Sequence, residues 1–354
     1  MPVNACFLLV VVAAGGAALS FALVSLFCRA ALRHRIVDSP NERSLHRQPT
    51  PRGGGVAIVV VSLIGILLCW ALVPSWPVLP LLCFIGAGLV VAAVSWRDDV
   101  RPLPNVVRFG AHVLASVVVL AGVGSCVTVE APVVGFFRFG YLGLPMTLLW
   151  IAGLTNAYNF MDGIDGIAAG QAVVAGLGWV ALAGSAVRIE VCLGLLLAAS
   201  SLGFLAHNWP PAKIFMGDVG SAFLGFSFAV LAIIGAQHNP RLALAGILVV
   251  WPFVFDTSFT FLRRLRRGEN VFQAHRSHLY QRLVLAGYSH QFVTCVYGAL
   301  AVLGVFLALI WKQRIAAASW LVPSALVSAM VGLWLFVGWA ERRQKARVPE
   351  GARP

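Results

Sequence analysis

The sequence predicts an all-α, polytopic integral membrane protein with about eleven transmembrane helices. Its composition is 60% hydrophobic and 11% charged, with a mean hydropathy of +0.87, whereas soluble globular domains carry about 25% charged residues. Apolar runs long enough to cross a bilayer, which takes about 20 residues, recur along the whole chain. Five polar, chemically reactive stretches interrupt these runs, at 38–55, 96–108, 156–166, 207–221 and 263–290.

The individual spans follow from these apolar runs. The first run has no charged start and ends at Arg29, Arg33 and Arg35, which favours a retained span over a cleaved signal peptide. The fifth and sixth runs are the weakest, because polar residues crowd their shared end. We place the spans near 4–28, 56–73, 78–95, 107–123, 141–157, 168–187, 189–206, 220–236, 242–262, 293–311 and 317–338.

The distribution of positive charge predicts the topology. Of the 26 Lys and Arg residues, 21 lie in connections that follow odd-numbered spans or in the C-terminal tail. The positive-inside rule places this face, with all the polar stretches, in the cytoplasm and the N-terminus outside. We expect one integral membrane domain over residues 1–340 and a basic, disordered tail over 341–354.

Charge and cysteine content limit the partners. The formal net charge of +13 makes the lipid bilayer, anionic head groups and anionic substrates the expected partners. Nucleic acid is not expected, because no soluble domain presents a groove for it. The seven cysteines lie mostly in or beside spans without metal-ligand spacing, so we expect buried free thiols.

Two adjacent carboxylates, Asp98 and Asp99, follow the third span. One interpretation is a solvated loop in which they pair with Arg97 and Arg101. The other is metal or proton chemistry beside an anionic substrate, because adjacent carboxylates repel each other and nothing structural requires two at a membrane edge.

Four polar residues end the fifth span at intervals of three: Asn156, Asn159, Asp162 and Asp165. If the helix continues, this spacing places them on one helical face. Amides and carboxylates at the end of a membrane span cost free energy unless ligands provide hydrogen-bond or ionic partners. Gly163 permits a sharp turn after the helix. We therefore favour a ligand site over a purely structural turn.

Two further aspartates lie at or in later spans. Asp218 begins the eighth span between glycines, and it is either a helix N-cap or an oxygen ligand for Mg²⁺. Asp256 lies within the ninth span, and an intramembrane carboxylate is a functional candidate. A salt bridge from Asp256 to a loop arginine is the alternative.

The largest cytoplasmic loop is basic. Its four arginines within 263–267 are most simply a topology anchor. His275, Arg276 and His278 add hydrogen-bond donors that match a pyrophosphate.

The stretch before the second span is also polar. It contains Asn41, Arg43 and His46, and it ends in the glycine triplet 53–55. A glycine triplet at a helix N-terminus is a candidate anion nest.

In this order, these stretches resemble the polyprenyl-phosphate N-acetylhexosamine-1-phosphate transferases of glycosyltransferase family 4, to which the MraY-type translocases are related. The resemblance covers about residues 35–290. Its motifs are D-x-P-N-x-R-x-x-H from Asp38, the pair Asp98-Asp99, N-x-x-N-x-x-D-G-x-D-G from Asn156, F-M-G-D-x-G-S from Phe215, and the histidines of the last cytoplasmic loop.

The resemblance implies transfer of a sugar 1-phosphate from a UDP-N-acetylhexosamine to undecaprenyl phosphate with release of UMP. This would be the first membrane step of O-antigen or related polysaccharide synthesis in the bacterial inner membrane. Mg²⁺, with Mn²⁺ as an alternative, would be held by Asp218 and Asp162. Asp98 and Asp99 would bind or deprotonate the lipid phosphate, and Asp165 would complete the catalytic carboxylates.

The same resemblance implies a set of substrate-binding residues, with Phe215 near the uracil and the histidines near the pyrophosphate. This set is Asn41, Arg43, His46, Gly54, Asn156, Asn159, Asn208, Phe215, Asp256, His275, Arg276 and His278. MraY-type enzymes carry consecutive histidines in this loop, so the spacing of His275 and His278 favours the O-antigen-initiating branch. The sugar, the general base, single or double displacement, and the oligomeric state, including a homodimer, stay open.

Three other classes fit less well. A UbiA-type prenyltransferase needs a second Asp-rich motif, and a CDP-alcohol phosphotransferase needs D-G-x-x-A-R, whereas the sequence from Asp165 lacks that arginine. A secondary transporter places its ionisable groups near the bilayer midplane, whereas most of those in this chain gather at one rim.

Overall fold

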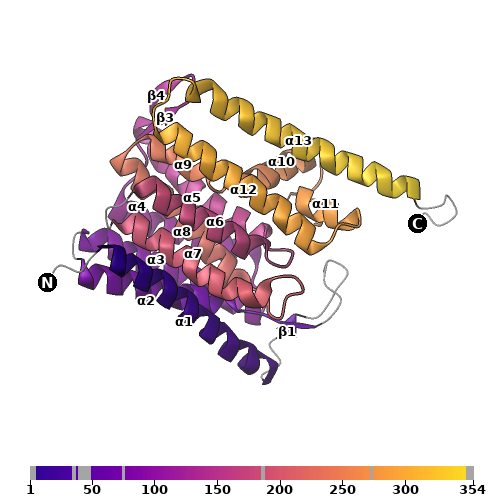
Figure 1. Ribbon diagram of the computed structural model, residues 1–354, viewed down its shortest axis with the longest axis horizontal. Coiled ribbons are helices and arrows are strands. Elements are labelled where there is room, and N and C mark those ends of the chain that lie inside the picture. The colour runs from indigo at the N-terminus through magenta and orange to yellow at the C-terminus, as the bar shows by residue number, and fades with distance from the viewer. Residues whose placement is uncertain are drawn as a thin grey trace.

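The computed structural model describes residues 5–33, 37–38, 49–73, 76–184, 188–271, 273 and 275–347, and within them the chain is almost entirely helical (Figure 1). The helices are α1 (Ala5–Arg33), α2 (Gly55–Leu72), α3 (Val78–Val100), α4 (Asn105–Val123), α5 (Gly143–Phe160), α6 (Ile167–Ala183), α7 (Ile189–Asn208), α8 (Asp218–His238), α9 (Arg241–Leu248), α10 (Trp251–Arg266), α11 (Leu279–Leu285), α12 (His290–Lys312) and α13 (Ala318–Arg347). The shorter elements are β1 (Val37–Asp38), β2 (Thr50–Pro51), β3 (Thr128–Ala131), β4 (Gly135–Arg138) and a 3₁₀ turn, Gly140–Leu142.

The helices confirm an all-α, multi-pass membrane protein. Among the described residues, eight helices are long and apolar enough to cross a membrane, or nine if the bent pair α9 and α10 counts as one span. Every predicted span contains a helix, but α5 and α6 fall outside this set. Helix α6 is shorter, and polar residues crowd the end of α5.

The predicted continuous span 242–262 is wrong, because the chain breaks between α9 and α10 and bends by 76°. Pro252 lies in the first turn of α10. Proline lacks the N–H of a continuing helix and clashes with the carbonyl four residues earlier, so the helix restarts. The side-chain amide of Gln171 donates to the Val249 carbonyl at 2.8 Å, which satisfies the backbone at the break.

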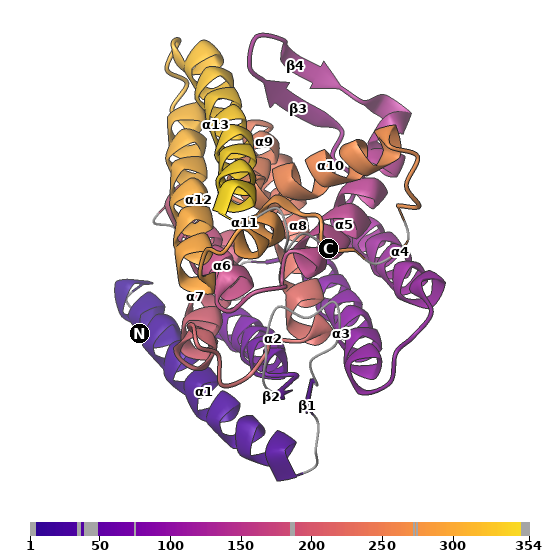
Figure 2. The ribbon, with the colours of Figure 1, turned by 90° about the vertical axis from the view of Figure 1, so that its right-hand side faces the viewer.

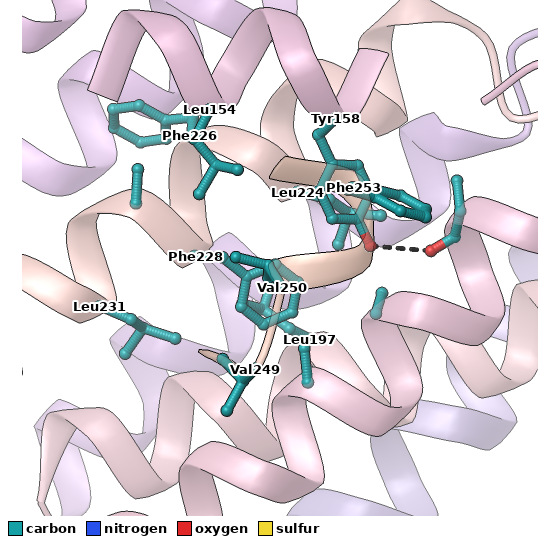
Figure 3. Packing of buried hydrophobic residues seen from close by; sticks show 14 of the residues in the cluster. Leu154, Tyr158, Leu197, Leu224, Phe226, Phe228, Leu231, Val249, Val250 and Phe253 are labelled. Carbon is teal, nitrogen blue, oxygen red and sulfur yellow. Dashed lines mark hydrogen bonds between the residues drawn. The ribbon is translucent and has the colours of Figure 1, made fainter. Parts of the chain in front are cut away.

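Helix α8 forms the centre of the bundle, and its apolar window is completely buried. Tyr158 of α5 packs against Phe228 of α8 and Phe253 of α10, with ring centroids 6.0 and 4.9 Å away (Figure 3). Gly225 permits the close approach of α5, since a Cβ there would lie 2.6 Å from that of Tyr158. The buried centre therefore holds the first residue of α8 at a defined place on the rim.

Two features differ from the sequence prediction. The loop between α4 and α5 contains the antiparallel hairpin β3–β4, at the end of the molecule opposite α11 and the C-terminus (Figure 1). An ion pair between Glu130 and Arg241 and a bond from the Glu130 amide to the Pro240 carbonyl (3.3 Å) hold it on α9. The tail predicted to be disordered from residue 341 instead continues α13 as far as Arg347.

Candidate active site

Three aspartates and two arginines from distant parts of the chain meet at one rim of the bundle. We name Asp98, Asp99 and Asp218 the carboxylate cluster. Arg52, just before α2, approaches Asp99 Oδ1 with its Nε at 2.9 Å and Asp218 Oδ1 with its Nη2 at 2.7 Å. Arg108, in the first turn of α4, approaches Asp98 Oδ2 at 2.9 Å and Asp218 Oδ2 at 3.2 Å with its Nη1. The two guanidinium groups therefore neutralise carboxylates that would otherwise repel each other.

Asp99 is the aspartate that caps α8. Its carboxylate is 1% exposed and accepts hydrogen bonds from the amides of Asp218 (2.9 Å) and Val219 (3.0 Å). The N-cap alternative for Asp218 is wrong, because Gly217 occupies that position. Gly217 has φ +78°, and a Cβ there would lie 2.6 Å from Asp99 Oδ2, so both the backbone and the contact require glycine. The Asp218 side chain is left free to face the two arginines.

Asp98 points to different partners from its neighbour. It accepts hydrogen bonds from the Leu103 amide (2.5 Å) and from Arg108. Arg97 donates to the Arg101 carbonyl at 3.0 Å. Within the described part of the chain, the salt bridges of the aspartate pair are to Arg108 and Arg52, so the predicted pairing with Arg97 and Arg101 is wrong.

The four residues from Asn156 to Asp165 do not share a helical face, because α5 ends at Phe160. Asn156 is still helical, and its amide lies 3.0 Å from His112 Nδ1 of α4. Asn159 accepts a hydrogen bond from the Ser221 hydroxyl at 3.2 Å, which joins α5 to the start of α8. The chain then turns between residues 161 and 166, and a Cβ on Gly163 would lie 2.1 Å from the Tyr280 hydroxyl.

Asp162 and Asp165 lie in this turn and have different surroundings. Burial and the neighbouring Asp218 carboxylate raise the pKa of Asp162 well above its ordinary value. Asp165 accepts a hydrogen bond from the Ala212 amide at 3.1 Å, and its carboxylate lies 3.4 Å from His290 Nδ1. Asp162 is therefore buried where the Asp218 charge acts on it, whereas Asp165 contacts the loop at Ala212 and helix α12.

The glycine triplet does not form the predicted anion nest. The amides of Gly53 and Gly54 donate to the Phe215 carbonyl at 3.1 and 3.0 Å, and that of Gly55 donates to Met216 at 2.9 Å. A Cβ on Gly55 would lie 2.4 Å from the Cα of Gly220. The triplet therefore lets α2 approach α8 closely and so positions Arg52 beside Asp218.

Asn208 connects two backbone segments in the same region. It is 4% exposed, accepts a hydrogen bond from the Gly166 amide at 2.9 Å and donates to the Ile214 carbonyl at 2.9 Å. Phe215 is half-buried, and its amide donates to the Pro51 carbonyl at 2.8 Å. Of the other predicted substrate-binding residues, Asn41, Arg43 and His46 lie outside the described residues.

Asp256 is fully buried, and donors of the protein surround both of its oxygens. These are the Thr260 hydroxyl (3.1 Å), His278 Nδ1 (3.2 Å), the Leu279 amide (2.8 Å), the Tyr280 amide (3.1 Å) and the Tyr297 hydroxyl (2.5 Å). The predicted alternative of a salt bridge to a loop arginine is wrong, because the partner is His278. Asp256 therefore positions His278 and the start of α11.

The segment that carries His275 and His278 contacts the end of α5 through Tyr280, whose hydroxyl donates to the Phe160 carbonyl at 3.0 Å. His275 and His278 have ring centroids 5.0 Å apart. Burial, and next the charge of His278, lower the pKa of His275 to about 4, so this imidazole is neutral at pH 7. Its Nδ1 accepts from the Ser277 amide at 3.3 Å, which leaves the proton on Nε2. Arg276 is exposed.

Sequence analysis did not select Arg52, Arg108 or His112 as site residues. Arg108 and His112 are four residues apart at the start of the fourth span, which is the spacing of one helical face. Arg52 directly precedes the glycine triplet. Those positions were the available signal. Apart from the Arg108–Asp98 pair, which is ten positions apart, the contacts that give them a role join residues more than 40 positions apart.

A multi-pass helical bundle with carboxylates, arginines and histidines gathered at one rim defines a membrane protein with a charged candidate site at its edge. Comparison with known proteins agrees. Residues 81–236 match the model of glycosyl transferase family 4. A probable undecaprenyl-phosphate N-acetylglucosaminyl 1-phosphate transferase of Bacillus subtilis is 34% identical over 269 residues, 74% of each chain.

Two further relatives have names that also describe phosphotransferases or transferases. A decaprenyl-phosphate N-acetylglucosaminephosphotransferase of Mycobacterium leprae is 30% identical over 73% of this chain and 72% of its own. A phospho-N-acetylmuramoyl-pentapeptide-transferase of Synechococcus sp. (strain JA-3-3Ab) is 29% identical over 76% and 82%. The chain belongs to glycosyl transferase family 4, which confirms the resemblance found in its motifs.

Proposed function

We propose that this protein transfers an N-acetylhexosamine 1-phosphate from a UDP-sugar to undecaprenyl phosphate, releasing UMP. The supporting observation is the carboxylate cluster, which two arginines bridge. The segment that carries His275 and His278 is joined to the end of α5 by Tyr280, whose hydroxyl donates to the Phe160 carbonyl. Such an arrangement can bind two anionic groups from opposite sides. The names of the relatives support a polyprenyl phosphate as the acceptor and N-acetylglucosamine as the sugar. The product would start O-antigen or a related polysaccharide.

We propose that Asp218 and Asp162 hold Mg²⁺, with Mn²⁺ as an alternative, because Asp162 is buried within reach of the Asp218 charge and a cation would offset both. Among the described residues, no group of three or more His, Cys, Asp or Glu side chains is arranged as a metal site. Mg²⁺ commonly takes only one or two protein carboxylates and completes its coordination with phosphates and water. When bound, it would neutralise phosphate charge as the bond to the leaving group breaks.

The two neighbouring aspartates suit different tasks. Asp99 is buried and already caps α8, so we assign it to positioning. The Asp98 carboxylate is 10% exposed and can accept a proton from the lipid phosphate or orient it. Arg52 and Arg108 are about one third exposed and can donate to phosphate oxygens. Nε2–H of His275 supplies a neutral donor for the pyrophosphate.

Direct attack by the lipid phosphate predicts that no UMP forms from UDP-N-acetylglucosamine and Mg²⁺ without undecaprenyl phosphate. The acceptor oxygen is a competent nucleophile once the charge of the donor is screened, so no aspartyl intermediate is needed. Rapid quenching with radiolabelled donor measures this, and membranes given both substrates should yield UMP and labelled lipid. A stoichiometric burst of UMP from donor alone would show double displacement. Labelled uptake into vesicles without labelled lipid would show a transporter.

We further propose that the carboxylate cluster faces the cytoplasm of a bacterial inner membrane. The support is the 21-to-5 division of basic residues between the two faces. In a cysteine-free background, cysteines introduced at 97–105 or 268–280 should be shielded from an impermeant thiol reagent added to intact cells. A cysteine at Val133, which is 61% exposed in the β3–β4 hairpin, should react. Labelling of residues 97–105 from outside would reverse the topology.

A further inference from the structure

His112 lies one helical turn beyond Arg108 on α4, where the charges of Arg108 and Asp218 act on its ring. Helix α4 is at the edge of the bundle, beside α3 and α5 (Figure 2). It is long and apolar enough to cross a membrane. His112 is seven residues past its first residue, Asn105, which is about 10 Å along the helix. An ionisable side chain at that depth costs free energy and is a candidate for function.

Asn156 of α5 determines which nitrogen of His112 carries the proton. The side-chain nitrogen of Asn156 donates to the Ala152 carbonyl at 2.7 Å, which fixes the orientation of the amide, since its oxygen would repel that carbonyl. The same nitrogen lies 3.0 Å from Nδ1 of His112. An amide nitrogen donates and does not accept, so Nδ1 is the acceptor and the ring proton is on Nε2.

The Nε2–H group of His112 is left without an acceptor. His112 is 3% exposed. Within the described part of the chain Nε2 makes no hydrogen bond, and it is not completely enclosed, so the remaining accessible surface of this side chain includes Nε2. A donor in a nearly buried position costs free energy until an acceptor reaches it. The imidazole therefore presents one neutral N–H donor to whatever occupies the space beside it.

The side of α5 that carries Asn156 is open toward the outside of the bundle. Residues spaced by three and four positions form this face: Leu149, Gly153, Asn156 and Phe160. Leu149 is 65% exposed and Phe160 is 52% exposed, and a Cβ on Gly153 would meet no atom within 4 Å. Acyl chains of a bilayer contact such an apolar face. The face therefore leads from the membrane past Asn156 to His112.

We propose that Nε2–H of His112 donates to the phosphate of the polyprenyl phosphate acceptor, one helical turn from Arg108. This rests on the proposed function, because it assigns a residue to the acceptor of that reaction. The lipid fits better than the UDP-sugar, since His112 lies within a membrane-spanning helix beside an apolar face, whereas a nucleotide sugar arrives from water. A neutral donor suits this place, because a further cation would repel Arg108. Asn156 acts on the lipid through His112 and is a positioning residue.

Steady-state transfer by purified protein tests the assignment, with UDP-N-acetylglucosamine and undecaprenyl phosphate varied in turn. His112→Asn keeps an oxygen near the position of Nδ1 to accept from Asn156 but has no group at Nε2. It should raise KM for the lipid by about tenfold or more, the loss expected for a hydrogen bond to a charged group, and leave KM for the UDP-sugar unchanged. His112→Gln, whose amide nitrogen reaches the Nε2 position, should restore most of the affinity for the lipid. The matched control is Ser116→Ala, which removes a buried hydroxyl one turn further along α4 and should leave both KM values unchanged.

A purely structural contact between α4 and α5 predicts the opposite order, with His112→Asn tolerated and His112→Gln disruptive, and that order would overturn the assignment. Equal increases in both KM values would also overturn it. His112→Leu keeps the volume of the side chain and should show the same loss for the lipid, which covers the case in which the asparagine variant does not fold. Native mass spectrometry of bound undecaprenyl phosphate separates the two proposals. Failure of the unmodified protein to release UMP would overturn the transfer reaction, whereas equal lipid binding by the unmodified protein and by both His112→Asn and His112→Leu would overturn the role of His112.

Discussion

Replacing Asp218 by asparagine should reduce transfer by about three orders of magnitude or more, since a metal at this position supplies several kcal/mol of charge stabilisation. The change also removes the carboxylate that Arg52 and Arg108 share. The measurement is UMP release from UDP-N-acetylglucosamine with undecaprenyl phosphate, over a range of Mg²⁺ concentrations. The variant should fold, because Gly217 and Asp99 cap α8 without the Asp218 side chain.

The matched control is Glu341→Gln, which removes a carboxylate from the α11–α13 contact outside the carboxylate cluster. It should keep transfer close to that of the unmodified protein. Near-normal turnover of Asp218→Asn at saturating Mg²⁺ would show that Asp218 is a structural partner of the two arginines and not a metal ligand.

Replacing each of the two adjacent aspartates by asparagine should have a different main effect: lower turnover for Asp98 and lower stability for Asp99. Asp98→Asn should slow turnover by about 10²–10⁴-fold, the range of a general acid–base group, while the melting temperature and UDP-sugar binding by calorimetry stay unchanged. Asp99→Asn should lower the free energy of unfolding by about 1–3 kcal/mol, because it leaves the α8 cap and Arg52 without a buried charge.

Thermal unfolding and calorimetry on both variants check this division. Equal stability of the two variants would contradict the capping role of Asp99. Loss of UDP-sugar binding in Asp98→Asn would place this carboxylate on the donor side of the site instead of the acceptor side.

Some features of the site could be read from local pattern. The apolar runs predicted where helices lie, because a chain inside a bilayer must satisfy its backbone within the helix. The motifs around Asp98, Asp162 and Asp218 predicted residues that lie near one another in the fold. The family that these motifs resemble is the one whose model matches the chain. The signal for the broken ninth span was also present, because Pro252 cannot continue a helix.

Local rules failed where a contact from a distant segment decided the outcome. Asp218 fits the N-cap preference of a helix start, but Asp99 of α3 takes that role. The glycine triplet fits an anion nest, but the backbone of Phe215 and Met216 uses its amides. In both cases the competing group lies far away in the sequence and cannot be seen from residue spacing.

Hydrophobic length and motif order are local properties, so the amino-acid order alone predicts a helical membrane protein with its reactive residues at one rim. Which side chains remain free for a ligand depends instead on how the helices pack in three dimensions. Packing of α2, α3, α4 and α8 places Arg52 and Arg108 among the aspartates. It also directs the Asp99 carboxylate to the N-terminus of α8, where it caps the helix. Asp256 likewise binds His278 and the backbone of α11, since a buried carboxylate requires donors wherever the fold supplies them.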